Sequence, residues 1–182
     1  MIEVRWHGRG GQGAVTSVEL LAVAAIAAGK YAQGFPSFGP ERRGAPVAAF
    51  TRIDDKKINV RSGIYEPDVV LILDSSLIGL VNVTDGLKPN GKVIVNTNRS
   101  PEEIRRELDF KGTVATVDGT GIARKEMGVP IANTTMIGAL LKVTGVMELD
   151  AMKDSVEHRF GRIAQKNLNA MKRAYDEIKI SN

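Results

Sequence analysis

The sequence predicts an α/β domain with a mainly parallel sheet, an added β-hairpin and a helical C-terminal third. Two observations lead to this prediction. Apolar, strand-like runs alternate with helical patterns over the first two thirds of the chain, and the last third repeats its apolar residues at helical spacing. No internal repeat, low-complexity segment or linker divides the 182 residues. We therefore expect a single domain over residues 1–182.

The first third of the chain contains the expected hairpin. "IEVRW" (Ile2–Trp6) predicts a strand, and the apolar stretch behind it predicts a helix over Ala14–Ala28 that ends at Gly29. An irregular segment is expected from Gln33 to Pro46, which holds three prolines and three glycines. Next, "VAAFTRI" and "INVRS" flank residues 54–57 in the manner of hairpin arms.

The middle of the chain predicts three buried strands and a capped helix. "DVVLIL" (Asp68–Leu73) is apolar on both faces, as parallel strands are, and "KVIVNT" (Lys92–Thr97) repeats this pattern. "SPEEIRREL" predicts a helix with Ser100 as its N-cap and Pro101 at its first position. "TVATVD" predicts another strand, followed by a short helix around Ile122–Met127.

The last third predicts helices only. Asn133 and Thr134 can cap a helix over "TMIGALLKVT", which ends at Gly145. A helical segment over Leu149–Arg159 and a long amphipathic helix follow. The apolar residues of that final helix lie mostly on one face, which favours a core-facing helix over a partner-binding surface. They are Phe160, Ile163, Leu168, Met171, Tyr175 and Ile178.

Composition limits the chemistry of the chain. It has no cysteine and two histidines, His7 and His158. The absence of cysteine excludes disulfides, thiolate nucleophiles and cysteine-ligated iron–sulfur clusters, and two histidines disfavour a zinc site. The net charge of +4 suits an anionic ligand or an acidic partner. No basic run or stacking cluster indicates nucleic-acid binding, so none is expected.

The sequence also predicts where the protein resides. The longest apolar run, Val18–Ala28, contains Glu19 and is too short to cross a bilayer. Met1 leads directly into a strand, without the pattern of a cleavable signal. We expect a cytoplasmic protein without membrane binding.

A glycine-rich loop is the first candidate site. In "HGRGGQGAVTS" (His7–Ser17), the residues Gly8, Gly10 and Gly13 fit G-x-G-x-x-G, with Gly11 in addition. A predicted strand precedes this loop and a predicted helix follows it, as the dinucleotide fingerprint requires. The N–H groups and dipole at the start of such a helix favour a phosphate or pyrophosphate.

The second half of the dinucleotide fingerprint is missing. An NAD site needs an acidic residue about 20 positions further on to bind the ribose hydroxyls, and Ala28–Pro36 contains none. Lys30 could meet a 2′-phosphate, but a Pro/Gly-rich segment follows it. These residues favour an anion other than NAD(P). A purely structural turn is the remaining alternative.

"GFPSFGPERRGAP" (Gly34–Pro46) is the second candidate site. Long loops in compact domains tend to be functional or disordered, and the aromatic and proline residues of this one favour order. Glu41, Arg42 and Arg43 lie between Pro40 and Gly44, where two guanidinium groups could meet a carboxylate or phosphate. A solvated loop that only packs against the domain is the alternative.

Other motifs predict no catalytic centre. "GLKPNGKV" (Gly86–Val93) has P-loop spacing up to its lysine, but it lacks the hydroxyl residue and the following helix. The nucleophile motif G-x-S-x-G is absent. His7 is expected to make a structural hydrogen bond, and His158 to be solvated. The aspartates near strand ends are expected to cap the next turn; they are Asp68, Asp74 and Asp118.

Three segments resemble one family. "RWHGRGGQGAV", "FPSFGPERRGAPVAAFTRI" and "NTTMIGALLKVTG" are similar, in this order, to segments of the gamma subunits of 2-oxoacid:ferredoxin oxidoreductases, above all of pyruvate:ferredoxin oxidoreductase (pyruvate synthase). The "GAPV" after the twin arginines favours the pyruvate and branched-chain types over the 2-oxoglutarate type. The resemblance runs from Ile2 through the last helices, and the C-terminal helix is its least distinctive part.

The resemblance implies a Rossmann-like, three-layer fold and a supporting role in an anaerobic enzyme. Such enzymes convert a 2-oxoacid, coenzyme A and oxidised ferredoxin into acyl-coenzyme A, carbon dioxide and reduced ferredoxin, or run in reverse. Thiamine diphosphate, magnesium and the iron–sulfur clusters are expected on the partner alpha, beta and delta subunits. The gamma subunit itself is expected to bind none of these cofactors and to be inactive alone.

The resemblance also assigns site residues. Gly8, Arg9, Gly10, Gly11, Gln12 and Gly13 would form the loop that faces the nucleotide part of coenzyme A. Glu41, Arg42 and Arg43 would lie in the loop that faces the neighbouring catalytic subunit. The glycine loop could instead serve the subunit interface alone. Two further alternatives are a stand-alone NAD(P)-binding enzyme and a small domain that senses an adenine nucleotide.

Overall fold

A computed structural model describes residues 1–37 and 43–181 of the chain. Its centre is a seven-stranded sheet with the strand order β2-β3-β1-β4-β5-β6-β7. The parallel core consists of β1 (Ile2–Arg9), β4 (Val69–Ile72), β5 (Lys92–Asn96) and β6 (Thr113–Val117). The other three strands run antiparallel to their neighbours and are β2 (Tyr31–Pro36), β3 (Pro46–Asp54) and β7 (Lys179–Ser181).

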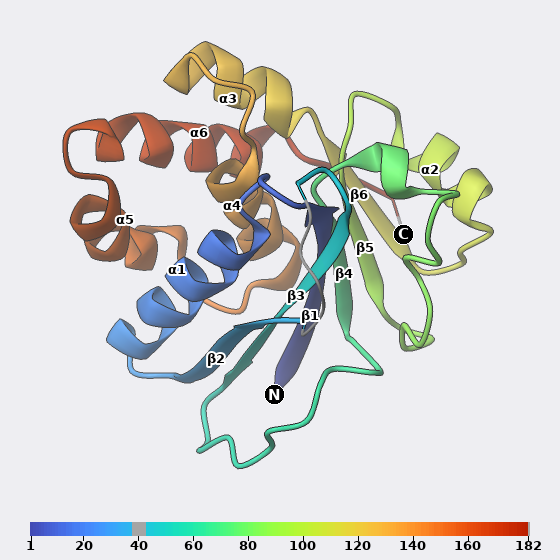
Figure 1. Ribbon diagram of the computed structural model, residues 1–182, viewed down its shortest axis with the longest axis horizontal. Helices are drawn as coiled ribbons and strands as arrows, with labels where there is room; N and C mark the ends of the chain where they lie inside the picture. The colour runs from blue at the N-terminus through green and yellow to red at the C-terminus, as the bar shows by residue number, and fades with distance from the viewer. Residues whose placement is uncertain (38–42, 182) are drawn as a thin grey trace.

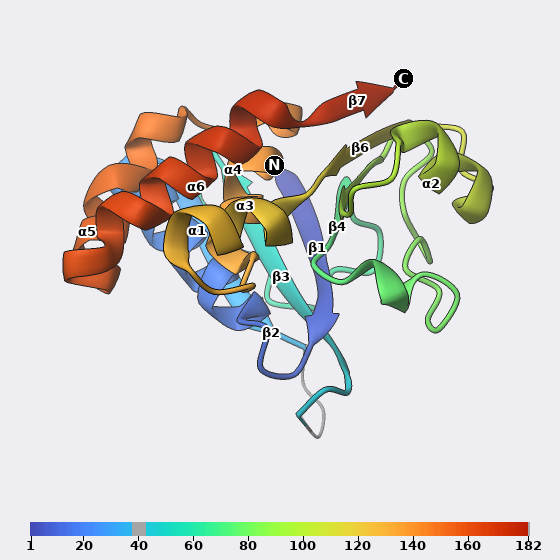
Figure 2. The same ribbon diagram turned by 90° about the horizontal axis from the view of Figure 1, so that it is seen from above.

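Helices cover the two faces of the sheet unequally (Figures 1 and 2). One face carries α1 (Ala14–Ala27), α3 (Gly119–Met127), α4 (Asn133–Thr144), α5 (Lys153–Phe160) and α6 (Ala164–Glu177). The other face carries α2 (Pro101–Leu108) and a short 3₁₀ turn, Ser75–Leu77. Further 3₁₀ turns, Leu149–Met152 and Gly161–Ile163, flank α5. The predicted three-layer α/β class is confirmed.

The parallel strands are apolar on both faces because each face has its own core. In β4, Val69 and Leu71 belong to the large core under α1 and α4, whereas Val70 and Ile72 belong to a smaller core under α2. Alternate residues of a strand point to opposite faces, so a strand between two layers must be apolar throughout. This confirms the interpretation of "DVVLIL" as a buried parallel strand.

Several predicted elements are confirmed in detail. Ser100 accepts a hydrogen bond from the Glu103 N–H, and the Glu103 carboxylate accepts one from the Ser100 N–H, which completes a capping box at α2. Helix α4 ends at Gly145, in the left-handed conformation (φ 60°). Helix α3 begins three residues earlier than expected, since Asp118 caps it by accepting from the Gly121 N–H.

Of the two predicted hairpin arms, "VAAFTRI" is confirmed as part of β3, and the second arm is wrong. The segment "INVRS" forms no strand, and β3 instead pairs antiparallel with β2 on one side and β1 on the other. Because both hydrogen-bonding edges of β3 are occupied, no edge remains for residues 58–62. The added antiparallel pair therefore consists of β2 and β3. Residues Gln33–Pro36, expected to be irregular, form part of β2.

The end of the chain also differs from the prediction. The expected helix over Phe160–Ile178 is interrupted: α5 ends at Phe160 and α6 starts at Ala164. Gly161, with φ 49°, marks this break. After α6 the chain forms β7, which pairs with β6 and was not expected. In the described ranges, no helix is both long and apolar enough to span a bilayer.

Candidate functional site

The glycine loop lies where the strand order of the sheet reverses. From β1 the chain passes to β2 and β3 on one side, whereas β4 lies on the other side of β1. Ligands of open α/β sheets bind at this point, beyond the carboxyl ends of the strands. Strand β1 extends through Gly8 and Arg9, so the loop itself comprises Gly10–Gly13.

Two glycines of the loop have left-handed backbones. Gly13 (φ 82°) directly precedes α1, and a side chain there would meet the Asn133 Nδ2 at 2.3 Å. Gly11 (φ 93°) differs, since a Cβ there would have no neighbour within 4 Å in residues 1–37 and 43–181. Position 13 is thus fixed by packing against α4, whereas position 11 leaves an open approach to the backbone.

Arg9 fastens the loop to two neighbouring segments. Its guanidinium donates to Asp74 Oδ2 (3.1 Å), to Ser76 Oγ (2.8 Å) and to the carbonyl oxygen of Gly44 (3.0 Å). The guanidinium therefore has three acceptors within the chain and holds the loop in position.

Gln12 and Asp74 complete this network. The Gln12 Oε1 accepts from the Arg9 N–H (2.8 Å), and the Gln12 Nε2 donates to Asp74 Oδ2 (2.9 Å). Asp74 also caps the 3₁₀ turn after β4 through the Ser76 N–H, as expected of an aspartate at a strand end. Its position at the end of a strand did not indicate that Asp74 also accepts hydrogen bonds from two residues of the glycine-loop segment, Arg9 and Gln12.

The network lowers the pKa of Asp74. Partial burial alone would raise this pKa, but hydrogen bonds from Ser76 and Gln12 and the charge of Arg9 together outweigh it. A carboxylate with a lowered pKa stabilises the fold above the pKa it has in the unfolded chain. That stability is lost as the pH falls through the pKa of the folded state.

Replacement of Asp74 by asparagine is therefore expected to lower the free energy of unfolding by about 1–2 kcal/mol at pH 7, since an amide pairs poorly with the Arg9 and Gln12 donors. Urea unfolding at pH 7 and below pH 4 would measure this loss, which should shrink at the lower pH. Asp109→Asn is the matched control, because Asp109 is exposed and sits at a left-handed helix cap that asparagine tolerates. Equal losses in both variants would contradict the prediction.

The structure brings the second candidate loop against the glycine loop. The Gly10 N–H donates to the Ala45 carbonyl (2.9 Å), and the Gly44 N–H donates to the Gly10 carbonyl (3.0 Å). Arg43 forms a parallel bridge with Gly10 through the backbone and is exposed. Glu41 and Arg42 lie outside the described residues. Two segments that the sequence singled out separately thus form one surface.

A small polar cavity of about 90 Å³ adjoins the glycine loop. Gly11 and Gln12 line it together with Asn96, Thr120 and Asn133. Helix α4 begins at Asn133 and α3 at Gly119, next to Thr120, so the positive ends of two helix dipoles meet there. The cavity has room for a phosphate-sized group, whereas ligand pockets for whole small molecules measure about 300–1,000 Å³.

Sequence reasoning missed two of the residues that line this cavity. Asn96 ends β5, and its amide donates to the Leu73 carbonyl and to Thr120 Oγ1 (both 2.8 Å). Its Oδ1 accepts from the Thr120 N–H (3.1 Å). The available signal was a polar residue at the carboxyl end of each predicted parallel strand, since those ends meet at one edge of the sheet.

His7 makes the structural hydrogen bond expected of it. Its Nε2 accepts from the Arg5 Nε at 3.0 Å, so the ring must be neutral at that nitrogen. Burial, and then the charge of Arg5, lower the pKa of His7 to about 4. The folded state therefore disfavours protonation of His7.

A pH dependence of stability follows from His7. Between the unfolded pKa near 6.5 and the folded pKa of about 4, the unfolded chain binds more protons than the folded chain. The free energy of unfolding should therefore decrease as the pH is lowered through this range, by up to about 3 kcal/mol. Urea unfolding at pH 7.5, 6.5, 5.5 and 4.5 measures this, and His7→Gln should flatten the profile. An NMR titration in which the His7 ring protonates near pH 6.5 would contradict it.

Comparisons with known proteins agree with the fold. The model of the "Pyruvate ferredoxin/flavodoxin oxidoreductase" family matches residues 3–177. The "Pyruvate/ketoisovalerate oxidoreductases common subunit gamma" of Thermococcus kodakarensis is 53% identical over 179 residues, 97% of each chain. "Pyruvate synthase subunit PorC" of Methanocaldococcus jannaschii is 50% identical, over 98% of this chain and 97% of that one. The crystal structure of pyruvate oxidoreductase subunit PORC from Thermotoga maritima superposes with a TM-score of 0.90 at 40% identity, over 100% and 98% of the two chains.

Proposed function

The chain belongs to the pyruvate ferredoxin/flavodoxin oxidoreductase family as a gamma-type subunit, and we propose that it supports coenzyme A binding and subunit packing in the assembled enzyme. The reaction we propose converts pyruvate, coenzyme A and oxidised ferredoxin into acetyl-coenzyme A, carbon dioxide and reduced ferredoxin. One relative is named as a subunit common to pyruvate and ketoisovalerate oxidoreductases. We therefore propose a branched-chain 2-oxoacid as the second substrate class to test. We further propose that the chain acts as one domain of this type, in the cytoplasm.

The observation that carries the coenzyme A proposal is the open backbone at Gly11 beside a phosphate-sized polar cavity. Coenzyme A presents a pyrophosphate and a 3′-phosphate, and backbone N–H groups at a helix start suit such anions. Binding of the pyrophosphate or of the 3′-phosphate does not require the ribose-binding acidic residue that the sequence lacks. The nucleotide body would lie outside the cavity, where a partner subunit can cover it.

In this proposal the residues of the glycine loop have different roles. Gly10 and Gly11 would let the backbone approach the ligand, and Gly8 and Gly13 would allow close packing of the loop on Leu73 and Asn133. Arg9 and Gln12 act as positioning residues, because their polar groups are engaged with Asp74. Glu41, Arg42 and Arg43 would face the neighbouring catalytic subunit.

The redox chemistry is assigned to partner chains. The sequence offers no cysteine to ligate an iron–sulfur cluster. Residues 1–37 and 43–181 hold no group of three His, Asp or Glu side chains arranged for a metal ion. We propose that thiamine diphosphate, magnesium and the clusters reside on alpha, beta and delta subunits, which also contact ferredoxin. Family membership does not favour the alternative of a stand-alone NAD(P)- or adenine-nucleotide-binding protein.

The test is an anaerobic pull-down of the tagged chain from its native cells. Recovery of thiamine-binding and iron–sulfur subunits, with pyruvate- and coenzyme A-dependent dye reduction in the eluate, is the expected result. The chain purified alone should reduce neither ferredoxin nor viologen with pyruvate. A lone monomer or homodimer whose stability rises with ATP or AMP would overturn the proposed function.

A further inference from the structure

A second, larger cavity lies away from the glycine loop and shares no residue with it. Its volume is about 480 Å³, and Arg5, Phe35, Phe50, Arg61 and Tyr65 are among its lining residues. Arg5 alternates in β1 with Val4 and Trp6, which belong to the core under the helices. The cavity therefore opens on the opposite face of the sheet, over β1, β3 and β2.

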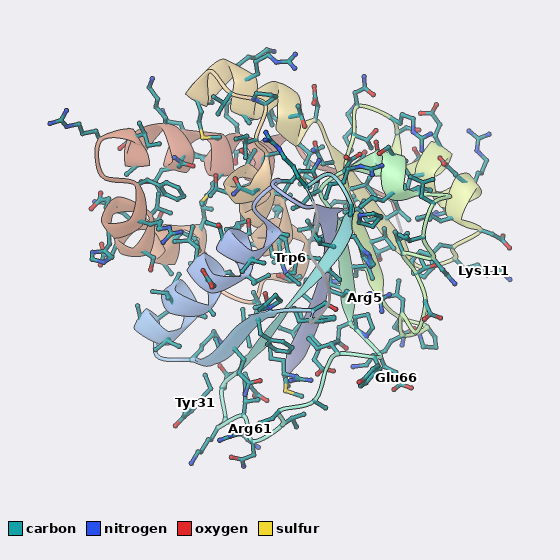
Figure 3. All side chains as sticks on the ribbon, in the orientation of Figure 1. Arg5, Trp6, Tyr31, Arg61, Glu66 and Lys111 are labelled. Carbon is teal, nitrogen blue, oxygen red and sulfur yellow. The ribbon has the colours of Figure 1, made fainter. Side chains whose placement is uncertain are left out.

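The connection from β3 to β4 is fastened across this face. The Arg52 guanidinium donates to the Gly63 carbonyl (3.1 Å) and to the Glu3 carboxylate (2.7 Å), and the Gln33 amide donates to the Val60 carbonyl (3.1 Å). Figure 3 shows Arg61 and Glu66 on this connection, at the margin of the molecule remote from α3 and α6. Two side-chain hydrogen bonds thus attach the connection to the sheet beside the cavity.

Arg5 forms the inner wall of the cavity and is held in one orientation. Its guanidinium donates to His7 Nε2 and to the carbonyl oxygens of Val83 and Asp85. Burial lowers the pKa of Arg5, against the charge of Asp85, but a guanidinium stays protonated at neutral pH. The side chain is only 8% exposed, so its position is fixed before any partner arrives.

The outer wall combines aromatic rings with an unpaired cation. The Phe35 and Phe50 rings lie 5.4 Å apart, and Tyr65 is 77% exposed although it borders an apolar surface. Arg61 makes no ion pair with any of the described residues. Tyrosine and arginine next to a ready-made pocket are the residue types that dominate the energetics of protein interfaces.

The charges on the connection favour an acidic partner. Asp55 forms an ion pair with Lys30 (2.6 Å). The exposed cations Lys56, Lys57 and Arg61 then outnumber the exposed carboxylates of Glu66 and Asp85, of which Asp85 lines the cavity itself. A carboxylate is the group that a guanidinium binds with two parallel hydrogen bonds. The excess of positive charge would also steer such a partner toward the cavity.

We propose that this cavity is a docking site for an acidic segment of a partner subunit, with a carboxylate received at Arg61 and an apolar neighbour packed on Phe50 and Tyr65. The inference rests on the proposed function, because it requires a hetero-oligomer. It adds an interface that is separate from the glycine loop and from residues 41–43.

The first experiment places the photocrosslinker p-benzoylphenylalanine at position 65 in the tagged chain of the assembled enzyme. Irradiation should join it to a partner-subunit peptide that contains Asp or Glu, identified by mass spectrometry. Absence of a crosslink in an active complex, a crosslink to a second copy of this chain, or one to a segment without acidic residues would overturn the proposal. If the unaltered chain recovers no partner subunit, the proposed function fails, and this inference fails with it.

The second experiment reverses one charge. Arg61→Glu should weaken assembly with the partner subunits at least tenfold at low salt and reduce its salt dependence, because an attraction becomes a repulsion. Lys111→Glu is the control, since Lys111 is also exposed and lies beyond α2 (Figure 3). Both variants leave the core untouched and should unfold like the parent chain. Equal assembly of the two variants would overturn the proposal.

Discussion

Replacement of Gly138 by valine is expected to prevent stable folding of the chain. Gly138 lies in α4, where that helix crosses α6, and a Cβ there would come within 1.9 Å of the Met171 carbonyl oxygen. The obstacle is backbone and cannot rotate away, so the two helices would have to separate. Overpacking in cores costs about 1–3 kcal/mol where side chains can adjust. Here we expect a cost of about 4 kcal/mol or more, a large part of a domain's stability.

The measurement is the free energy of unfolding in urea, with Gly63→Ala as the matched control. The nearest atoms to a Cβ at Gly63 would belong to the Tyr65 side chain, at 3.5 Å, which is an ordinary contact. The control should therefore lie within about 1 kcal/mol of the parent chain. A Gly138→Val chain that unfolds like the parent would mean that α4 and α6 do not approach as closely as described.

Replacement of Gly11 by valine is expected to raise the KM for coenzyme A at least tenfold in the assembled enzyme, with the KM for pyruvate unchanged. A Cβ at position 11 would have no neighbour within 4 Å among the described residues, so the new side chain would extend into the space through which a ligand approaches. Loss of one hydrogen bond to a charged phosphate costs about 1.5–3 kcal/mol, and 1.4 kcal/mol corresponds to about a tenfold change in affinity.

Backbone strain needs its own control, because valine disfavours the left-handed conformation at position 11. Gly29 (φ 81°) follows α1 at the end opposite to the glycine loop and also has open space around its missing Cβ. Gly29→Val thus incurs similar strain and should leave the KM for coenzyme A unchanged. An unchanged KM in Gly11→Val, combined with loss of partner subunits, would show that the loop serves the subunit interface and not the ligand.

Local patterns predicted the elements whose sequences carry their own signals. The capping box at Ser100, the glycine after α4 and the doubly apolar β4 are readable because each depends on neighbours in sequence. Strand β2 is different, since Gly34 and Pro36 weaken its pattern and its pairing with β3 is a tertiary contact. Gly34 also packs against the Val18 carbonyl, where a Cβ would come within 2.4 Å. Strand β7 was missed because it is short and depends on a tertiary contact, its pairing with β6.

The candidate site was predictable as two separate loops but not as one surface. The G-x-G-x-x-G spacing located the first loop, and proline and arginine content located the second. Their contact through Gly10 requires β3 to lie beside β1, which the expected hairpin arms did not imply. Asp74 was expected only to cap a turn, because no local pattern indicates that its second carboxylate oxygen meets Arg9 and Gln12.

The backbone pairing of Gly10 with Gly44 and Ala45 has a thermodynamic consequence. These hydrogen bonds couple the backbones of the two loops, so a ligand that shifts Gly10 also shifts the segment beside Arg43. In the function we propose, one loop binds coenzyme A and the other meets the catalytic subunit. The two binding equilibria then share a coupling free energy, and linkage makes it reciprocal. If assembly raises the affinity for coenzyme A by a given factor, bound coenzyme A raises the affinity between the subunits by the same factor.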